Sequence, residues 1–369
     1  MSKDFIGIII TKALYNQILK SKDPAIIKRL GLREEAGEKN NLTPCYFRIT
    51  DIAAGQEQIR ALVKKAGKYQ AAYVPLPKVI YNQIWDSPTH LRVIKSLTNK
   101  GIHVFNEINY LKKNKFYELL AKHSELSSHL PHTEILTSEN LQNMMQKYTQ
   151  LILKPDNGLI GRGILKLEKI DTSNWCLYYR AWEGTKKVWK QMLFQDQLPQ
   201  LILQLMNRNL YLVQEVIPLA TYKGSPFDLR VATQRNHSGN WEVKAIIGKV
   251  AGQGNFLTNI GQGGRAYSLE TLLKDYPQLS HESLNKHISS LAVKIADYFS
   301  DYLPHSADLG LDIALTADGF PYFIECNFVS AYKVLALRNG ELINEEWKSV
   351  FTTPIEYGRY LLDKDTHNI

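Results

Sequence analysis

Apolar and polar positions alternate in short blocks through the first third of the chain. The blocks at residues 5–10, 71–76 and 102–106 are rich in Ile, Val, Tyr and Phe and have the length of buried strands. Between them, the stretch Gln56–Lys68 has a polar pattern typical of a helix. The pattern predicts an N-terminal α/β domain, which we place at residues 1–112.

The next part of the chain begins with a helical pattern and then becomes rich in strands. Apolar residues recur at helical spacing from Phe116 to Leu126, and the pattern ends before Pro131. Apolar runs with strand character follow at Leu151–Lys154, Gly163–Leu167, Leu210–Ile217, Phe227–Arg235 and Trp241–Val250. The last two flank residues 237–240 (His-Ser-Gly-Asn), a typical hairpin connection.

A helical stretch at Leu284–Phe299 and a final hairpin complete this region. We therefore expect a second domain of mixed α+β structure at residues 113–330, divided into two subdomains near residue 213. Residues 331–369 are expected to form a C-terminal helical tail that packs on the core.

The composition is that of a globular, soluble protein. Hydrophobic residues make up 44% and charged residues 22% of the chain, and no apolar run approaches the roughly 18 residues of a membrane-spanning helix. The first apolar block is too short for a secretory signal. Cys45, Cys176 and Cys326 lie far apart, show no metal-ligand spacing and cannot all be paired within one chain. We expect a reducing cytoplasm.

The formal net charge of +9 favours anionic partners. These partners include nucleotide phosphates, an acidic substrate, nucleic acid or a membrane surface, and charge alone does not choose among them. A solvated, lysine-rich surface accounts for the charge equally well. Because the lysines form no long basic block and no nucleic-acid motif occurs, we favour a small-molecule or peptide substrate over nucleic acid.

A candidate phosphate site lies at the end of the run Leu151–Lys154. Lys154 is followed by a loop that contains Gly158, Gly161 and Gly163 before the next strand begins. Glycines allow backbone N–H groups to approach phosphate oxygens, and the lysine adds a positive charge. A plain glycine-rich hairpin explains the segment equally well. The order of residues matches neither a P-loop nor a dinucleotide-binding motif.

A candidate metal site lies on the hairpin at residues 309–327. Side chains alternate along a strand, so Glu325 and Asn327 share one face, and Asp312 can join them from the partner strand. Three oxygen ligands on a rigid hairpin suit Mg²⁺. The alternative is an amphipathic hairpin whose acids face solvent, but these acids lie among large apolar residues, where an unpaired carboxylate is costly to bury.

Three further segments carry chemistry that is weak when each is taken alone. Residues 214–218 (Gln-Glu-Val-Ile-Pro) end a strand and present backbone groups that can pair with a purine. Asp228 and Arg230 share a strand face, and Lys249 follows on the next strand. Residues 259–264 (Asn-Ile-Gly-Gln-Gly-Gly) form another loop that allows close backbone approach. A salt-bridged surface is the usual explanation of such charged pairs.

Taken together and in this order, the motifs resemble the ATP-grasp superfamily, and more closely the YheC/YheD type, whose members are named endospore coat-associated. The resemblance covers about residues 106–330, and five ordered motifs are more specific than any one of them. It implies an N-terminal α/β domain followed by a two-subdomain ATP-grasp fold with ATP bound between the subdomains. It also implies an ATP-dependent ligase that uses Mg²⁺ and joins a carboxylate to an amine through an acylphosphate.

The resemblance assigns roles to the residues at matching positions. Contacts with ATP would come from Lys115, Lys154, Gly158, Gly161, Arg162, Gly163, Gln214, Glu215, Val216, Ile217 and Asp228. One or two Mg²⁺ ions would be held by Asp312, Glu325 and Asn327. The catalytic residues would be Arg230, Lys249 and Asn259.

Two positions depart from the pattern of related ligases. Many of them carry a basic residue where this chain has Gly310, and peptide-glutamate ligases tend to have Arg where this chain has Lys249. Lysine lacks the bidentate geometry of arginine. A kinase of the same architecture that phosphorylates a hydroxyl, and a nucleotide-binding assembly protein of the spore coat with little turnover, remain alternatives.

The substrate is expected to enter beside the loop at residues 255–265. Gly263 and Gly264 are followed there by Arg265, and an arginine beside flexible backbone is suited to binding a carboxylate. This favours an acidic amino acid, or a peptide that carries one, as the substrate. A surface role for Arg265 in closing a turn is the equal alternative, and the oligomeric state stays open.

Overall fold

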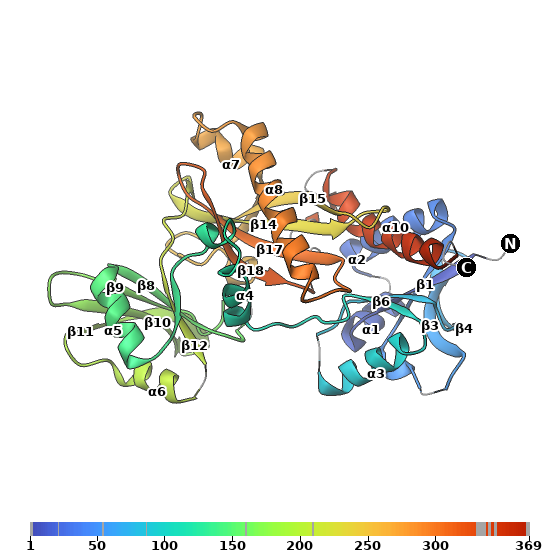
Figure 1. The fold of residues 1–369 in the computed structure, drawn as a ribbon, viewed down its shortest axis with the longest axis horizontal. Helices are drawn as coiled ribbons and strands as arrows, with labels where there is room; N and C mark the ends of the chain where they lie inside the picture. Colours follow the sequence, from blue (N-terminus) through green and yellow to red (C-terminus); the bar gives the residue numbers. More distant parts are fainter. Residues whose placement is uncertain are drawn as a thin grey trace.

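Three main sheets follow one another along the chain in the computed structural model (Figure 1). The structure describes residues 3–20, 22–53, 55–85, 87–158, 161–208, 210–329, 337–338, 341–342 and 345–366. Within these ranges, no helix is both long enough and apolar enough to cross a membrane. Cys45, Cys176 and Cys326 are all buried as free thiols.

The N-terminal sheet has six strands in the order β4-β3-β2-β1-β5-β6, and its neighbours from β2 to β6 pair in parallel. Its strands are β1 (Asp4–Ile9), β2 (Leu42–Phe47), β3 (Gln58–Lys65), β4 (Lys68–Pro75), β5 (Val79–Asn82) and β6 (His103–Phe105). Its helices are α1 (Lys12–Lys20), α2 (Pro24–Lys39) and α3 (Pro88–Thr98), with a short 3₁₀ turn at Ile49–Asp51.

The prediction of a helix at Gln56–Lys68 is wrong, because this stretch contains β3. Ile59, Ala61 and Val63 are buried on one face of the strand, which is an alternation of period two. A two-residue turn with positive φ at Ala66 (47°) and Gly67 (80°) then connects β3 to β4. The opposite face is mixed, with Leu62 buried and Gln58, Arg60 and Lys64 exposed.

The second sheet is antiparallel, with the order β11-β10-β9-β8-β12-β7. Its strands are β7 (Thr133–Ile135), β8 (Gln150–Pro155), β9 (Leu165–Lys169), β10 (Trp175–Glu183), β11 (Lys186–Phe194) and β12 (Tyr211–Glu215). Helices α5 (Ser138–Lys147) and α6 (Gln200–Arg208) contribute Leu141, Met144 and Ile202 to its core. Since β12 lies wholly in this sheet, the chain leaves the sheet after residue 215.

The third sheet is also antiparallel, with the order β16-β15-β14-β17-β18. Its strands are β13 (Thr221–Tyr222), which pairs with β14, then β14 (Ser225–Arg235), β15 (Trp241–Val250), β16 (Arg265–Ser268), β17 (Asp308–Leu315) and β18 (Pro321–Asn327). The two predicted hairpins, β14–β15 and β17–β18, are present. Short 3₁₀ turns lie at Ser127–His129, Ile260–Gln262 and Leu273–Asp275.

Helices cover both faces of the third sheet. On one face, α4 (Lys113–Leu120), α7 (Leu269–Leu272) and α8 (His281–Ser300) pack on alternate residues of β17, including Leu311 and Ile313. On the other face, α2 and α10 (Trp347–Thr366) pack against β14 and β15. Asp312 therefore lies on the face of β17 opposite α8.

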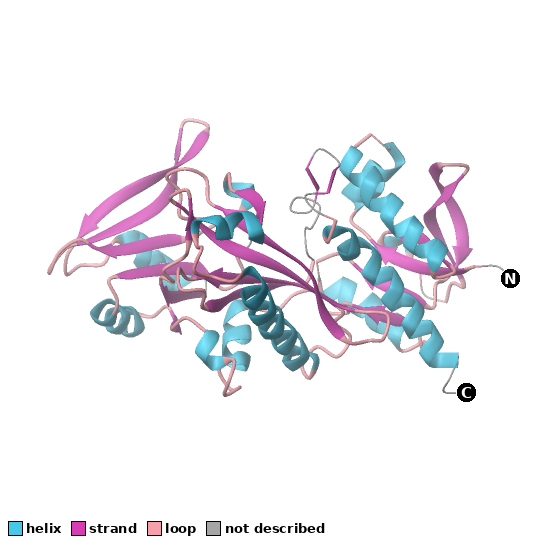
Figure 2. Ribbon diagram, turned by 90° about the horizontal axis from the view of Figure 1, so that it is seen from above, coloured by secondary structure: helices cyan, strands magenta, loops and turns pink. Residues whose placement is uncertain are grey.

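The last described helix, α10, also returns to the N-terminal sheet (Figures 1 and 2). Its residues Ile355, Tyr357 and Leu362 pack there with the apolar side chains of β1, β2 and β5. A short pair of strands, β19 (Leu337–Arg338) and β20 (Glu341–Leu342), precedes it. Part of the predicted C-terminal tail, residues 331–336, 339–340, 343–344 and 367–369, lies outside the described residues.

Asn106, just after β6, joins the N-terminal sheet to the third sheet. Its side chain is fully buried, and its backbone has φ of 53°, a left-handed conformation that asparagine tolerates. The amide Nδ2 donates to the carbonyls of Asp308 (2.8 Å) and Phe328 (3.1 Å), and Oδ1 accepts from the N–H groups of Ala307 (2.8 Å) and Asp308 (3.0 Å). One side chain therefore satisfies four backbone groups at the start of β17 and the end of β18.

We expect Asn106→Ala to lower the free energy of unfolding by about 3 kcal/mol, because it leaves buried backbone groups without partners. Asn99→Ala is the control, since Asn99 is exposed at the end of α3, and it should change the value by less than about 0.5 kcal/mol. Denaturant unfolding measures both variants. Equal effects of the two substitutions would contradict the assigned role of Asn106.

Candidate functional site

A cavity of about 370 Å³ lies between the second and third sheets. The second sheet contributes Gln150, Ile152, Lys154, Lys166, Gln214 and Glu215 to its wall. The third sheet contributes Asp228, Asp312, Ile324 and Glu325. Lys113 of α4, Pro155 of β8 and Pro226 of β14 also line it. The remaining lining residues lie in the connections, at Gly158, Gly161, Arg162, Ile164, Val216–Leu219 and Phe256–Asn259.

One part of the cavity is apolar and lies next to the backbone that follows β12. Ile152, Ile164, Val216, Leu257 and Ile324 provide apolar side chains from both sheets. Residues 216–218 follow the end of β12 and no longer form part of its strand, although the Val216 N–H still donates to the carbonyl of Gln150 (3.3 Å). Such a combination suits a flat heteroaromatic ring, which needs apolar faces and a few edge hydrogen bonds.

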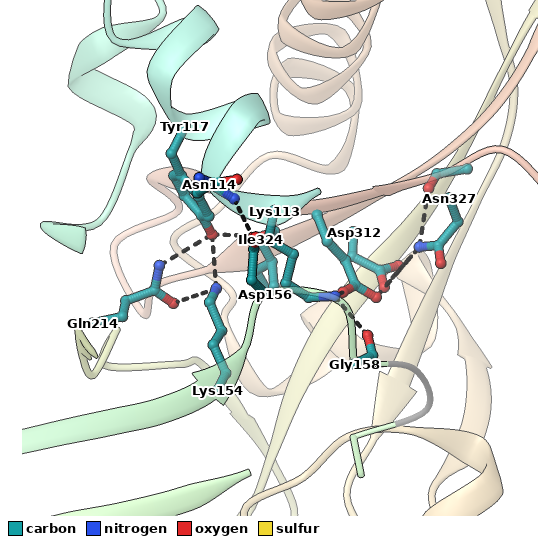
Figure 3. Close-up of polar contacts among 12 residues, drawn as sticks. Lys113, Asn114, Tyr117, Lys154, Asp156, Gly158, Gln214, Asp312, Ile324 and Asn327 are labelled. Atoms are coloured by element: carbon teal, nitrogen blue, oxygen red, sulfur yellow. Dashed lines mark hydrogen bonds and ion pairs between the residues drawn. The ribbon is translucent and has the colours of Figure 1, made fainter. Parts of the chain in front are cut away.

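Lys154 is buried where this part of the cavity becomes polar (Figure 3). Its Nζ donates to Tyr117 Oη (2.9 Å) and to Gln214 Oε1 (3.0 Å). Burial, followed by the nearby charge of Lys113, lowers the pKa of Lys154 to about 7. Among the described residues, no carboxylate lies within salt-bridge distance of Nζ, so the ammonium group is available to an anion in the cavity.

A second lysine, Lys113, reaches the same cavity from the start of α4. Its Nζ donates to the carbonyl of Gly158 (2.7 Å) and forms an ion pair with Glu325 Oε2 (3.2 Å). The predicted Lys115 is not brought to the cavity. Its side chain is 48% exposed and pairs with Glu118 on the same helix (3.1 Å). Lys113, which sequence reasoning missed, therefore occupies the place expected for Lys115.

The glycine-rich loop after β8 lies close to the loop after β15. Gly161 has φ of 66°, and a Cβ atom there would lie 2.7 Å from Asn259 Oδ1. The positive φ favours glycine, and a larger residue would also have to displace the Asn259 side chain. Leu159 and Ile160, in the middle of this predicted phosphate loop, lie outside the described residues.

Four charged side chains are buried together on the face of the third sheet opposite α8. Arg230 forms a bidentate pair with Asp312, from Nε to Oδ1 (2.6 Å) and from NH2 to Oδ2 (3.1 Å). Lys249 Nζ lies 3.0 Å from Asp312 Oδ1 and 3.1 Å from Asp228 Oδ2. All four side chains are at most 10% exposed.

The two carboxylates of this cluster titrate differently. Burial alone would raise the pKa of Asp312, but the charges of Arg230 and Lys249 hold it well below its usual range. Burial, only partly offset by Lys249, and the charge of Asp312 raise the pKa of Asp228 to about 6. Asp312 therefore stays ionised at neutral pH.

The predicted metal ligands converge at the edge of this cluster. Asp312 and Glu325 lie opposite each other on β17 and β18, and the amide Nδ2 of Asn327 lies 3.4 Å from both carboxylates. Like charges directly across a sheet are unfavourable unless a cation lies between or beside them. A half-turn of the Asn327 amide would present Oδ1 in place of Nδ2.

The donor set fits Mg²⁺. Two carboxylates and one amide oxygen are the hard ligands that Mg²⁺ prefers, with water and phosphate oxygens completing the octahedron. Within the described part of the chain, no group of three or more His, Cys, Asp or Glu side chains gathers to hold a metal. The site therefore depends on Asn327 and on oxygens supplied by a ligand.

The other predicted residues fall into two groups. Lining the cavity are Lys154, Gly158, Gly161, Arg162, Gln214, Glu215, Val216, Ile217, Asp228, Asn259, Asp312 and Glu325. Outside its lining are Lys115, Gly163, Arg230, Lys249, Asn327, Gly263, Gly264 and Arg265. Of these, Arg230, Lys249 and Asn327 contact Asp312 directly.

In the predicted substrate loop, the structure explains why residue 264 is glycine. A Cβ atom on Gly264 would lie 2.4 Å from the carbonyl oxygen of Thr258, so only glycine fits there. Arg265 is exposed on β16.

Tyr117 is the other residue that sequence reasoning missed. Besides accepting from Lys154, its hydroxyl accepts from Gln214 Nε2 (3.0 Å) and donates to the carbonyl of Ile324 (2.6 Å). Figure 3 shows these contacts meeting at one oxygen atom. Tyr117 is one helical turn after Lys113, and this i, i+4 spacing was the available signal.

Comparisons with known sequences place residues 101–361 within the sequence model of a family described as "YheC/D like ATP-grasp". Endospore coat-associated protein YheD of Bacillus subtilis (strain 168) is 24% identical over 347 residues, which cover 91% of this chain and 74% of YheD. Endospore coat-associated protein YheC of the same organism is 23% identical over 253 residues, which cover 67% of this chain and 66% of YheC.

Solved structures share the fold at low sequence identity. The VanG D-Ala:D-Ser ligase from Enterococcus faecalis has a TM-score of 0.53 and 12% identity, covering 97% of this chain and 99% of VanG. The ATP-grasp ligase PsnB complexed with minimal precursor has a TM-score of 0.51 and 14% identity, covering 90% of this chain and 92% of PsnB. The likeness is of fold.

The lowered pKa of Lys154 implies that burying this side chain destabilises the folded protein. The pKa of Lys154 is about 7 in the folded protein and 10.5 ordinarily. Between pH 7 and pH 10.5 the unfolded chain therefore binds more protons than the folded chain does. The free-energy cost of burying the charged Lys154 is thus fully present below about pH 7 and falls as the pH rises towards 10.5, the ordinary pKa of lysine. We expect Lys154→Met to raise the free energy of unfolding by about 2 kcal/mol at neutral pH, with a smaller gain at alkaline pH.

Denaturant unfolding as a function of pH measures this effect. Lys169→Met is the control, because Lys169 is exposed on the neighbouring strand β9, and it should show no such gain. A Lys154→Met protein that is less stable than the parent at neutral pH, or whose gain does not depend on pH, would contradict the assignment.

Proposed function

The chain belongs to the family of YheC/D-like ATP-grasp proteins, and from this premise we propose that it is an ATP-dependent ligase. In the proposed reaction a substrate carboxylate attacks the γ-phosphate of ATP, and an amine then captures the acylphosphate. The observation that carries the proposal is the meeting of Lys113, Lys154, Asp312 and Glu325 in one cavity with an apolar slot. This arrangement has a place for each part of Mg·ATP.

The residues supply binding and charge stabilisation rather than a nucleophile. The adenine would lie among Ile152, Val216 and Leu257, and the phosphates would extend towards Lys154 and Lys113. Bound Mg²⁺ would neutralise phosphate charge and align the transferring group. Asp312, Glu325 and Asn327 would hold it.

Arg230 and Lys249 are proposed to act mainly through Asp312. Both contact its carboxylate, and neither of them lines the cavity. They keep Asp312 ionised and oriented, which a metal ligand requires. Asn259, which lines the cavity next to Gly161, is proposed to position the phosphate loop.

The substrate, the cellular role and the domain organisation are also proposals. We propose an acidic amino acid or acidic peptide as substrate, supported by the net charge of +9. The loop with Gly263, Gly264 and Arg265 stays the proposed entry side. The names of YheD and YheC support an association with the spore coat, and the buried free thiols fit a reducing cytoplasm. Proposed domains are residues 1–112, 113–330 and 331–369.

The two lysines at the start of α4 provide a matched pair of variants. Lys113→Ala removes a cation from the cavity, and we expect the Kd for Mg·ATP to rise about tenfold. Lys115→Ala removes an exposed cation two residues away, and we expect the Kd to change less than about twofold. Calorimetric titration measures both. The reverse order of effects would assign the phosphate contact to Lys115 and contradict the proposal.

Product analysis tests the function. Purified protein with Mg·ATP is screened against acidic amino acids and peptides, each with and without an amine, for release of ADP and phosphate. We expect turnover only when acid and amine are both present. Glu325→Ala should lower turnover by at least about a hundredfold, while the exposed Glu118→Ala should not.

The alternatives give different products. A stable phosphorylated hydroxyl compound would identify a kinase. Tight ATP binding without turnover on any substrate would favour a nucleotide-binding assembly protein. Wild-type turnover by Glu325→Ala would contradict the metal assignment.

A further inference from the structure

The hairpin of β10 and β11 forms one end of the second sheet, at the left of Figure 1. Each of the two strands has nine residues. Among the described strands, β11 pairs only with β10, so its other edge carries unpaired backbone groups.

The geometry of the hairpin determines which groups point away from β10. Glu183 pairs with Lys186 across the two-residue turn Gly184-Thr185, and such a closing pair exchanges both hydrogen bonds. Hydrogen-bonded and non-hydrogen-bonded pairs then alternate along the ladder. The N–H and C=O groups of residues 187, 189, 191 and 193 therefore face outward.

Side chains on one face of the hairpin form alternating pairs of aromatic rings and cations. Lys187 Nζ lies 5.3 Å from the ring centre of Trp182, and the Arg180 guanidinium lies 5.4 Å from the ring of Trp189. These are the directly opposite residues in the strand pairing, so all four side chains lie on the same face.

The same face contacts a residue of the cavity wall. The Trp189 ring packs on Phe256, with ring centres 4.7 Å apart, and Phe256 lines the cavity. Arg180 donates a hydrogen bond to Gln262 in the loop that precedes β16. The hairpin of β10 and β11 therefore contacts the wall of the cavity through Phe256.

The hairpin exposes large apolar side chains and carries an excess of positive charge. Trp182 is 67% exposed and Leu193 is 68% exposed. The sequence of β10, the turn and β11 contains Arg180, Lys186, Lys187 and Lys190 against one acid, Glu183. A long, exposed strand edge of this kind is normally protected, and exposed apolar residues beside it mark an interaction surface.

We propose that the free edge of β11 binds an extended, acidic polypeptide as an additional strand, and that this polypeptide is the substrate whose carboxylate enters the cavity. The outward backbone groups provide the main-chain hydrogen bonds, and the cations on the hairpin attract acidic side chains. The inference rests on the proposed ligase function for the fate of the carboxylate, but the binding step does not need ATP.

A polypeptide fits this edge better than a nucleic acid does. Outward N–H and C=O groups recur at every second residue of β11, which is the repeat of a pairing strand and not of a phosphate backbone. The pairs of aromatic rings and cations would then lie beside alternate side chains of the bound segment.

Proline at Gln191 tests the backbone contacts directly. Gln191 is exposed and its N–H faces outward, so Gln191→Pro removes a donor at the free edge without breaking the pairing with β10. Gln191→Ala keeps the donor and is the matched control. Trp182→Ala removes the exposed ring that pairs with Lys187 and leaves the backbone unchanged.

The probe is a fluorescent, N-acetylated peptide of about ten alternating Glu and Val residues, titrated by polarisation without nucleotide. We expect Gln191→Pro to weaken binding about tenfold, Trp182→Ala to weaken it about fivefold, and Gln191→Ala to leave it unchanged. Circular dichroism checks that each variant is folded. If Gln191→Pro does not fold, the comparison of Trp182→Ala with the parent tests the proposal. Equal binding by all variants would overturn the proposal, as would tighter binding of an oligothymidylate of the same charge.

Phosphate release separates this inference from the proposed function. If single acidic amino acids with an amine support ATP-dependent phosphate release but the peptide does not bind, the inference fails and the ligase function stands. If the peptide binds through β11 but no acid supports phosphate release, the docking surface stands and the ligase function fails.

Discussion

The buried ion cluster of Arg230, Asp312, Lys249 and Asp228 is the interaction on which the third sheet and its site depend. Arg230 lies directly opposite Asp312 in the pairing of β14 with β17, and Asp228 lies opposite Lys249 in the pairing of β14 with β15. A slip of one residue would turn these charges towards the apolar face that packs on α8. The cluster therefore fixes the register of three strands.

The same cluster explains why so much charge is buried at this point. Removing one partner of a buried pair costs roughly 3–5 kcal/mol, yet a well-packed apolar replacement of the whole cluster would often be as stable. Stability alone does not require it. The arrangement keeps Asp312 ionised and fixed opposite Glu325, so that two carboxylates are held in place as ligands for a divalent cation.

Tyr117 connects this cluster to the other wall of the cavity. Its hydroxyl contacts Lys154 and Gln214 in the second sheet and the carbonyl of Ile324 next to Glu325 in the third. A lysine that would contact phosphate and a strand that would hold metal are thus held in a fixed relation by one buried oxygen. Relative movement of the two sheets would change both contacts together.

The sequence predicted those features that depend on local patterns. The hairpins β14–β15 and β17–β18 and the shared face of Glu325 and Asn327 follow from strand alternation and turn residues, and the structure has them. The helix expected at Gln56–Lys68 failed because the polar residues of β3 dominated the pattern, although Leu62 is buried on one face of the strand and its neighbours Ala61 and Val63 on the other.

Features that depend on tertiary packing could not be predicted in the same way. The lysine run at residues 112–115 does not reveal which side chain faces the cavity, because that depends on how α4 sits between the sheets. The sequence placed Asp228, Arg230 and Lys249 on adjacent strands, but the pairing of Arg230 with Asp312 required the position of β17, about 80 residues later.

A structure of the protein with Mg²⁺ and a non-hydrolysable ATP analogue would test the central claim most directly. The account predicts the adenine between Ile152, Val216 and Leu257, the phosphates beside Lys154 and Lys113, and the metal on Asp312, Glu325 and Asn327. A nucleotide bound outside this cavity, or a metal held by the phosphates without those three side chains, would contradict it.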